Sequence, residues 1–444
     1  MGNSQSSSAK TKILSPYQEK IIEIYQSICD VGILSKAKFQ DHFKGPSDTV
    51  TKNLFDRFFI DLLNSDSTTS NLFVERVQFI LDSVQSTEDE HYSFCMDILS
   101  DGNQPINKEE LERIINECRE FGMMNLEDDE NETKVEEQVS NDDSLSKAIL
   151  ETCEKIPGDD LREKFIKWCK LNFNKMFLGF QTWIVYKFTN VITITRSGTE
   201  ILPVPFECKS EKSKVQLNGT LLWFLCSLIP SCFTRMENKY KLSEDSELDD
   251  QAEENAKYTW NLLYDSNQHG LSLNRFKHKV MSYKSPTVSI ITFSGGVQVV
   301  LTLDQPWNDS PTKFGGPYCM LIEISPHVKI IEANASMVYL KELGRAVPTG
   351  LLIGSDSRAK ISIDKDLSTA QINYKHLIDE SVDRMEVWGC GGVVAIKSQA
   401  EQKKWESREI EKRKKVKLPG QWDQDKTILE MGGVTVNHSQ RGDM

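Results

Sequence analysis

The hydrophobic residues of the first half of the chain recur every three or four positions, as the buried face of a helix requires. The first such run begins after Ser15-Pro16, a pair typical of a helix start. The same spacing predicts helices over residues 35–43, 50–63, 72–84, 88–99 and 107–121. A second helical block includes a largely apolar segment from Asn218 to Ile229. The pattern therefore predicts an all-helical first half.

Beyond Tyr258 the spacing changes to the alternation that is typical of β-strands. Two segments rich in β-branched residues, 286–292 and 297–303, flank Gly295-Gly296, which predicts an antiparallel hairpin. Further strands are expected over 318–324, 328–331, 360–364, 370–374 and 385–388, with a helix over 273–283. We therefore expect an α+β protein in which helices precede a domain built on two antiparallel sheets, with flanking helices and a C-terminal helix.

Two strongly acidic segments divide the chain. Residues 126–143 contain nine acidic residues against Lys134 alone, and residues 243–254 contain seven acidic residues and no basic one. Such composition is typical of solvated connections. The expected division is a flexible tail at 1–14, a helical domain at 15–125, a linker at 126–143, a second helical region at 144–235, an acidic connection at 236–257, a β domain at 258–392, and a terminal helix and tail at 393–444.

Overall composition narrows the classes of partner. A chain of 444 residues accommodates about two to four domains. Its net charge of -13 would repel a phosphate backbone, so nucleic acid is not an expected partner. The longest apolar stretch, 221–229, is too short to span a bilayer. The ten cysteines contain no C-x-x-C pair, so we expect buried thiols, no metal site and no cofactor.

The N-terminus carries a lipidation pattern. Gly2 and Ser6 fit M-G-x-x-x-[ST], the pattern for N-myristoylation; the alternative is an unmodified serine-rich tail. One myristoyl chain supports only reversible membrane attachment, so stable residence needs a second contact. Lys10 and Lys12 are too few to supply it, and we expect a membrane-bound protein partner.

The segment from Asp101 to Leu111 resembles part of an EF-hand loop, with Glu110 at the twelfth position. Counting back places Leu99 at the first position, where a carboxylate is expected. Only Asp101, Asn103 and Glu110 offer side-chain oxygens. We therefore expect paired EF-hand-like helices without calcium; a calcium-responsive regulator is the alternative.

The chain lacks the usual catalytic motifs. It has no P-loop, no G-x-S-x-G and no H-E-x-x-H. His269 precedes Gly270 and suits either a helix-start hydrogen bond or a catalytic base, of which we favour the first. No catalytic residue is therefore assigned.

The C-terminal region predicts a charged helix. Ser398 and Glu401 form a capping box, and the helix is expected over 398–417. Residues 397–417 contain nine basic and four acidic residues, and Trp405 is among the few large apolar side chains. Such a helix is either solvated or held by an anionic partner surface, protein or membrane.

Four fragments in the second half resemble the TLDc family: Trp260–Leu273, Pro306-Trp307, Phe314–Gly316 and Met385–Gly389. Together with Gly2 and the EF-hand-like helices, the chain is similar to the N-myristoylated, mTOR-associated TLDc proteins over nearly its whole length. One departure is that Gly350–Gly354 leads to Ala359–Asp364, where the family carries a G-L-W-L-D type strand.

The resemblance implies a non-enzymatic adaptor at the cytoplasmic face of the lysosomal membrane, with the plasma membrane and a cytosolic pool as further locations. It implies binding to the vacuolar proton pump (V-ATPase) and to signalling-complex proteins in mTOR or insulin/FoxO-type growth signalling. A C-terminal helix can engage the pump in such proteins, which assigns a docking role to Trp405, Arg408, Lys412 and Arg413. The rival is an enzyme of oxidation-resistance or hydrolytic type.

Overall fold

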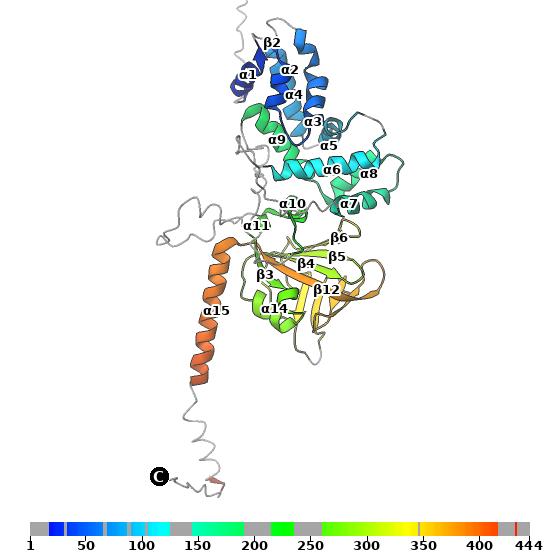
Figure 1. Cartoon of the computed structure of the whole chain (residues 1–444). Coiled ribbons are helices and arrows are strands. Elements are labelled where there is room, and N and C mark those ends of the chain that lie inside the picture. Colours follow the sequence, from blue (N-terminus) through cyan, green and yellow to red (C-terminus); the bar gives the residue numbers. More distant parts are fainter. Residues whose placement is uncertain are drawn as a thin grey trace, which may run out of the picture.

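The computed structural model of the protein describes residues 17–30, 33–64, 69–86, 90–102, 105–124, 144–190, 215–234, 260–344, 347–415 and 431–432. The expected tail 1–14, the acidic linker 126–143 and the acidic connection 236–257 lie outside the described residues. Figure 1 shows the helices of the first half packed on one side of a β domain, and a long terminal helix that leads away from it.

The first half is mainly helical, as predicted, but the all-helical prediction did not include the short antiparallel pair of Cys29–Asp30 and Ile33–Leu34. Its N-terminal elements are α1 (Gln18–Ser27), β1 (Cys29–Asp30), β2 (Ile33–Leu34), α2 (Lys36–His42), α3 (Asp48–Phe58), η1 (Ile60–Asn64), α4 (Thr69–Val84), α5 (Glu90–Leu99) and α6 (Lys108–Met123). The later helices are α7 (Ser144–Glu154), α8 (Leu161–Asn172), α9 (Leu178–Thr189), α10 (Gly219–Leu228) and α11 (Ser231–Thr234). Short polar side chains cap several of them; Asn107 accepts a bond from Glu110 N at the start of α6.

The two helical regions share one hydrophobic core. Helix α9 packs on α6 and also contacts α1 and α4. The ring of Phe188 on α9 lies 4.6 Å from that of Phe43, centroid to centroid. A Cβ at Gly179 would lie only 2.5 Å from the Cα of Gly122, so the two glycines allow α6 and α9 to approach closely.

The second half is an antiparallel β domain. Its elements are β3 (Asn261–Asp265), α13 (Ser266–His269), α14 (Leu273–Val280), β4 (Thr287–Phe293), β5 (Gln298–Leu303), β6 (Met320–Ser325), β7 (Lys329–Ala333), β8 (Val338–Lys341), β9 (Gly350–Ile353), β10 (Ile361–Ile363), β11 (Thr369–Ile372), β12 (Ile378–Gly389) and the terminal helix α15 (Gly392–Lys415). The α+β class is therefore confirmed.

Strand β12 joins the two halves of the sheet. Its C-terminal part pairs with β4 and β3, and its N-terminal part, 378–381, pairs with β11. In the described residues, ten strands thus form one sheet in the order β7-β6-β5-β4-β12-β11-β10-β9-β8, with β3 also on β12. The two expected sheets share this strand. Strands β3, β8 and β9 were not predicted from the alternation.

The helical half covers the outer face of β4, β5 and β6. Val288, Val300 and Ile322 belong to the core shared with the helices. The alternating residues Ile291 and Leu301 face a second core within the β domain. These strands are therefore buried on both faces, which explains why their sequences read as nearly continuous apolar runs.

Polar contacts hold the helices to the sheet edge. The buried Trp168 of α8 donates from Nε1 to the backbone oxygen of Val328, at 2.9 Å. Val328 N donates to Thr152 Oγ1 at 2.9 Å, and Ile330 N donates to Asn172 Oδ1 at 3.2 Å. These bonds occupy backbone donors beside the edge strand β7, which would otherwise be open to further strand pairing.

Candidate functional site

Two of the resembling fragments meet in the structure. Strand β3 pairs with β12, so that Asp265 lies opposite Glu386 although the two are far apart in sequence. Trp307, from a third fragment, donates to Thr287 Oγ1 at 2.9 Å. Gly315, from the fourth, has φ +116°, a conformation that favours glycine. The fragments are therefore structural parts of one domain.

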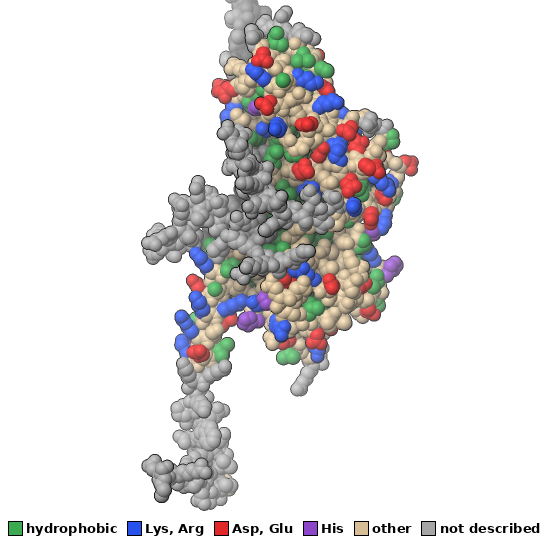
Figure 2. Space-filling model, in the orientation of Figure 1, with side chains coloured by type: hydrophobic (Ala, Val, Ile, Leu, Met, Phe, Trp, Pro, Cys, Tyr) green, Lys and Arg blue, Asp and Glu red, His purple; other side chains and the backbone are tan. Residues whose placement is uncertain are grey.

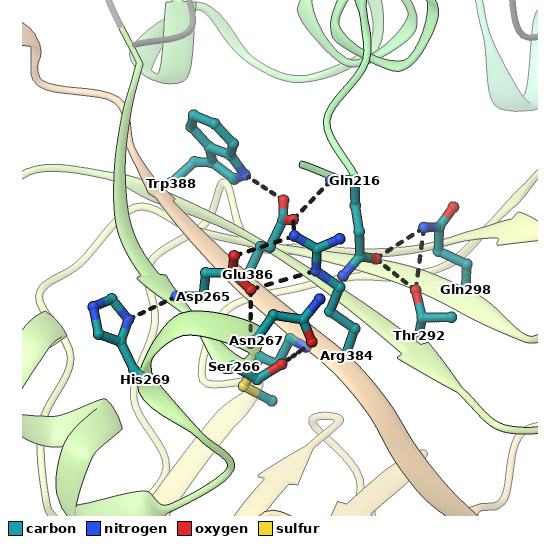
Figure 3. Close-up of polar contacts among 11 residues, drawn as sticks. Gln216, Asp265, Ser266, Asn267, His269, Thr292, Gln298, Arg384, Glu386 and Trp388 are labelled. Atoms are coloured by element: carbon teal, nitrogen blue, oxygen red, sulfur yellow. Dashed lines mark hydrogen bonds and ion pairs between the residues drawn. The ribbon is translucent and has the colours of Figure 1, made fainter. Parts of the chain in front are cut away.

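Arg384 forms a buried ion network at this meeting point (Figure 3). Its guanidinium donates to both carboxylate oxygens of Asp265, at 3.1 and 3.3 Å, and lies 2.8 Å from Glu386 Oε1. Both carboxylate side chains are 0% exposed. Asp265 also accepts from Asn267 N, at 2.9 Å, and so caps α13. The network fixes the β3–β12 pair and the loop that follows it.

Glu386 also holds the segment that enters from the helical half. Its Oε1 accepts from Gln216 N at 2.7 Å, and its Oε2 accepts from Trp388 Nε1 at 3.1 Å. Burial raises the pKa of Glu386, while the Gln216 bond and the Arg384 charge act in the opposite direction. The Gln216 side chain continues the network, because its oxygen accepts from Thr292 and Gln298.

Sequence reasoning missed this network. Asp265 and Glu386 both lie within the quoted fragments, but pairing them requires the register of β3 on β12. Arg384 lies just before the Met385–Gly389 fragment, and Gln216 lies outside all four. The local signal is limited to Asp265 and Glu386, each of which adjoins apolar residues of its strand.

His269 makes the hydrogen bond that we favoured for it. Its Nδ1 accepts from the backbone nitrogen of Asp265, at 3.1 Å, across the start of α13. The ring stacks on Tyr264, with centroids 5.7 Å apart. Burial lowers the pKa of His269, and Lys279 lowers it further. Because Nδ1 accepts the bond from Asp265 N, the proton of the ring lies on Nε2.

Helix α15 is attached at its N-terminal end and exposed beyond it. Ala395 and Ile396 pack against the β-domain core, and the buried Gln399 donates to the backbone oxygen of Lys279 at 2.7 Å. Trp405 is 58% exposed and Ile410 is 54% exposed. Figure 1 shows the later turns leading away from the domain. The first turns of the helix are thus fixed to the domain, and its later turns project from it.

The capping-box prediction for α15 was wrong. The helix begins at Gly392, directly after β12, so Ser398 and Glu401 lie within it. The continuous helix is set by the packing of its first turns on the domain rather than by a local cap. Sequence pattern alone could not show that packing.

The predicted docking residues lie mainly on one face of α15. At about 100° per residue, Trp405, Arg408 and Lys412 fall on the face opposite Gln399. All three are exposed, and Lys412 Nζ donates to Glu409 at 2.8 Å. Arg413 belongs to α15, roughly a quarter-turn from this face, and its side chain lies outside the described residues. Gly2 also lies outside them.

The side chain of Arg113 forms hydrogen bonds and ion pairs with residues in and beside the EF-hand-like loop. Arg113 donates to the backbone oxygen of Leu99, at 2.9 Å, and to Asp101 Oδ1, at 3.2 Å. It also pairs with Glu117 Oε1 at 2.5 Å. Glu110 Oε1 accepts from Asp101 N at 2.8 Å. These oxygens therefore have partners within the protein; Asn103 lies outside the described residues.

Cys153 and Cys319, two of the cysteines that the structure describes, are buried free thiols. Burial raises the pKa of the Cys153 and Cys319 thiols to about 12. In the described part of the chain, no group of three or more His, Cys, Asp or Glu side chains could hold a metal ion. Among the helices that the structure describes, none combines the length and the apolar character needed to cross a membrane.

Comparison with known proteins links the β domain to a family. The proteins named "Restriction of telomere capping protein 5" match this chain in part. The Colletotrichum graminicola protein is 45% identical over 64 residues, which cover 14% of this chain and 11% of that protein. The Saccharomyces cerevisiae protein (strain ATCC 204508 / S288c) is 24% identical over 174 residues, 32% of this chain and 30% of that protein.

The Candida glabrata protein is 25% identical over 175 residues, 33% of this chain and 31% of its own length. The matches thus span about a third or less of these relatives. The family model of the TLDc domain matches residues 236–391, which include β3 to β12 and Asp265, Arg384 and Glu386 of the network. Residues 236–391 of this chain are a TLDc domain.

Proposed function

We propose that this protein is a non-enzymatic, membrane-anchored adaptor that binds the vacuolar proton pump (V-ATPase) at the lysosomal membrane and acts in mTOR or insulin/FoxO-type growth signalling. In this proposal the N-myristoyl group on Gly2 holds the chain at the cytoplasmic face, and α15 contacts the pump. The observation that carries the proposal is the geometry of α15, which is fixed at its first turns and carries the exposed side chains of Trp405, Arg408 and Lys412 beyond them.

The structure of α15 suits a docking element. Its first turns are held by Ile396 and by the Gln399 bond to Lys279, so the direction of the helix is fixed before any partner binds. Beyond them, Trp405 and Arg408 are exposed on the same face. Tryptophan and arginine are enriched among residues that dominate binding energy at protein interfaces, and a preset direction lowers the entropy lost on binding.

The anchor and the helix support each other. A single myristoyl chain gives only marginal, reversible membrane binding. A helix that binds a resident membrane protein would supply the second contact. Attachment through either contact raises the effective concentration of the other at its target, so the two together bind more strongly than either alone.

The docking role can be tested with single substitutions. Trp405→Ala should weaken retention of the full-length chain by pump-containing membranes by about tenfold or more, because an exposed aromatic anchor is removed. The matched control is Ile410→Ala, which removes an equally exposed apolar side chain from another face of the same helix. The docking role is refuted if Trp405→Ala binds like the unmodified chain, or if Ile410→Ala is equally impaired.

The anchor is tested separately. Gly2→Ala abolishes the myristoylation pattern and should move the protein from the membrane fraction to the cytosol. Comparing it with Asn3→Ala, which keeps the pattern, controls for changes to the tail itself. An unchanged membrane fraction for Gly2→Ala would count against the lipid anchor.

The name of the relatives refers to telomere capping, which is a different process. The match covers about a third or less of those proteins, which is too little to assign the process in their name to this chain. A net charge of -13 gives no support for direct binding to DNA.

A further inference from the structure

A shallow basin lies beside the base of α15. It has a volume of about 500 Å³ and is lined by Gln268, His269, Asn274, Arg275, His278 and Lys279. The lining comes from the α13–α14 segment and contains two cations, two imidazoles and two amides. It contains no carboxylate, although the chain as a whole carries 66 acidic residues. The basin is therefore a local concentration of hydrogen-bond donors on an acidic protein.

The glycine of the His269-Gly270 pair shapes one wall. Gly270 has φ +75°, and a Cβ there would lie 2.6 Å from a terminal nitrogen of Arg275. The absence of that atom lets Arg275 donate to the backbone oxygen of His269, at 2.6 Å. The arginine is thereby positioned with most of its five donors unused by this bond.

Helix α15 adds a further cation at the edge. Gln399 holds α15 against α14 through its bond to Lys279 O, and Lys403 follows one turn later. The pKa of Lys403 is lowered, first by its partial burial and then by the nearby Lys279, with Glu406 acting in the opposite direction. Figure 2 shows blue side chains along α15 beside purple histidine side chains of the adjoining surface.

Glu406 acts on Lys403, but from beyond ion-pair distance. No carboxylate of the described residues lies within ion-pair distance of Lys279, Lys403 or Arg275. Lys277, on the same helix as Lys279, is different, because it pairs with Asp309 and Glu342. Placing two ammonium groups close together without a counterion is unfavourable, and a bound anion would relieve that repulsion.

We propose that this basin binds a compact phosphorylated anion that carries at least two phosphate monoester groups. Arginine binds phosphate through paired parallel donors, and lysine contributes point charge. The volume lies within the range of small-ligand sites, about 300–1,000 Å³, and is too small for an extended acidic segment. The proposed anion site is independent of the docking role of α15, because it involves Lys403 and not the face of the helix that carries Trp405.

The test uses the full-length Gly2→Ala chain, so that no lipid anchor contributes. Inositol trisphosphate is titrated and binding is measured by calorimetry. The double variant Lys279→Gln, Lys403→Gln should bind about 25-fold more weakly, at about fivefold per lysine. Lys397→Gln is the matched control, because Lys397 is an exposed lysine on α15 that falls on the side turned away from α14. It should bind like the parent chain.

Arg275→Gln provides a second variant if the double variant does not fold, and it should also weaken binding. A second arm uses vesicles that contain phosphatidylinositol bisphosphate, with phosphatidylserine vesicles of equal charge for comparison. Preferential sedimentation with the bisphosphate vesicles supports a lipid headgroup as the source, whereas binding of the soluble probe alone supports a free phosphate ligand. The proposal is overturned if the parent chain does not bind the trisphosphate, if Lys397→Gln is equally impaired, or if polyglutamate of equal charge displaces the probe as well.

Discussion

Replacing Arg384 by methionine should destabilise the TLDc domain strongly. The change keeps the length of the apolar stem and removes the charge between Asp265 and Glu386. Both carboxylates are fully buried, and Arg384 lies 2.8 to 3.3 Å from their oxygens. Breaking a buried pair by removing one partner costs about 3–5 kcal/mol, because an uncompensated charge remains inside the protein.

The effect is measurable by thermal unfolding. For a domain of this size, each kcal/mol shifts Tm by about 2–4 °C, so a fall of about 6–20 °C is expected. The control is Lys360→Met, which removes a 2.8 Å ion pair with the exposed Asp356. Exposed pairs contribute about 0.2–1 kcal/mol, so the control should fall by no more than about 4 °C.

The sign of the pH dependence gives an independent check. Burial already raises the pKa of Glu386, and Arg384 is among the groups that act against that rise. Without Arg384 the folded-state pKa rises further, and a group with a raised folded-state pKa favours folding more as the pH falls. Arg384→Met should have a lower free energy of unfolding than the parent. This difference should therefore shrink as the pH falls from about 7.5 to about 5.5. The reasoning would be refuted if Arg384→Met lost no more stability than Lys360→Met. It would also be refuted if the stability lost by Arg384→Met grew on acidification.

Three further predictions concern other parts of the chain. Gly350→Ala should lower the free energy of unfolding by about 1–3 kcal/mol, because φ at Gly350 is +113° and a Cβ would lie 2.1 Å from Ile363 O. The control Gly102→Ala should cost less, because Gly102 has φ +80° but open space around it. Urea unfolding of the two variants measures the difference. Calcium should leave Tm unchanged relative to a chelator, because Arg113 already occupies oxygens of the EF-hand-like loop; a clear rise in Tm would contradict this. Cys153, whose pKa is raised to about 12, should resist alkylation at neutral pH until urea unfolds the chain, as mass spectrometry of the labelled peptides would show.

The sequence by itself determined the features that depend on near neighbours along the chain. Helical spacing placed α4, α5 and α6 to within a few residues, and β-branched runs around Gly295-Gly296 placed the β4–β5 hairpin. These signals are local, because they follow from the period of a helix or a strand and from turn chemistry. The resembling fragments placed the TLDc domain for the same reason, since each is a short motif.

Tertiary structure alone decided which of those elements meet. The register of β3 on β12 brings Asp265 to Arg384, and the Gln399 contact sets α15 beside α14 and completes the basin. The start of α15 was mispredicted because its first turns are stabilised by burial against the domain rather than by Ser398. In each case the stabilising contact joins residues separated by a hundred or so positions, and no local pattern records the partner at such a distance.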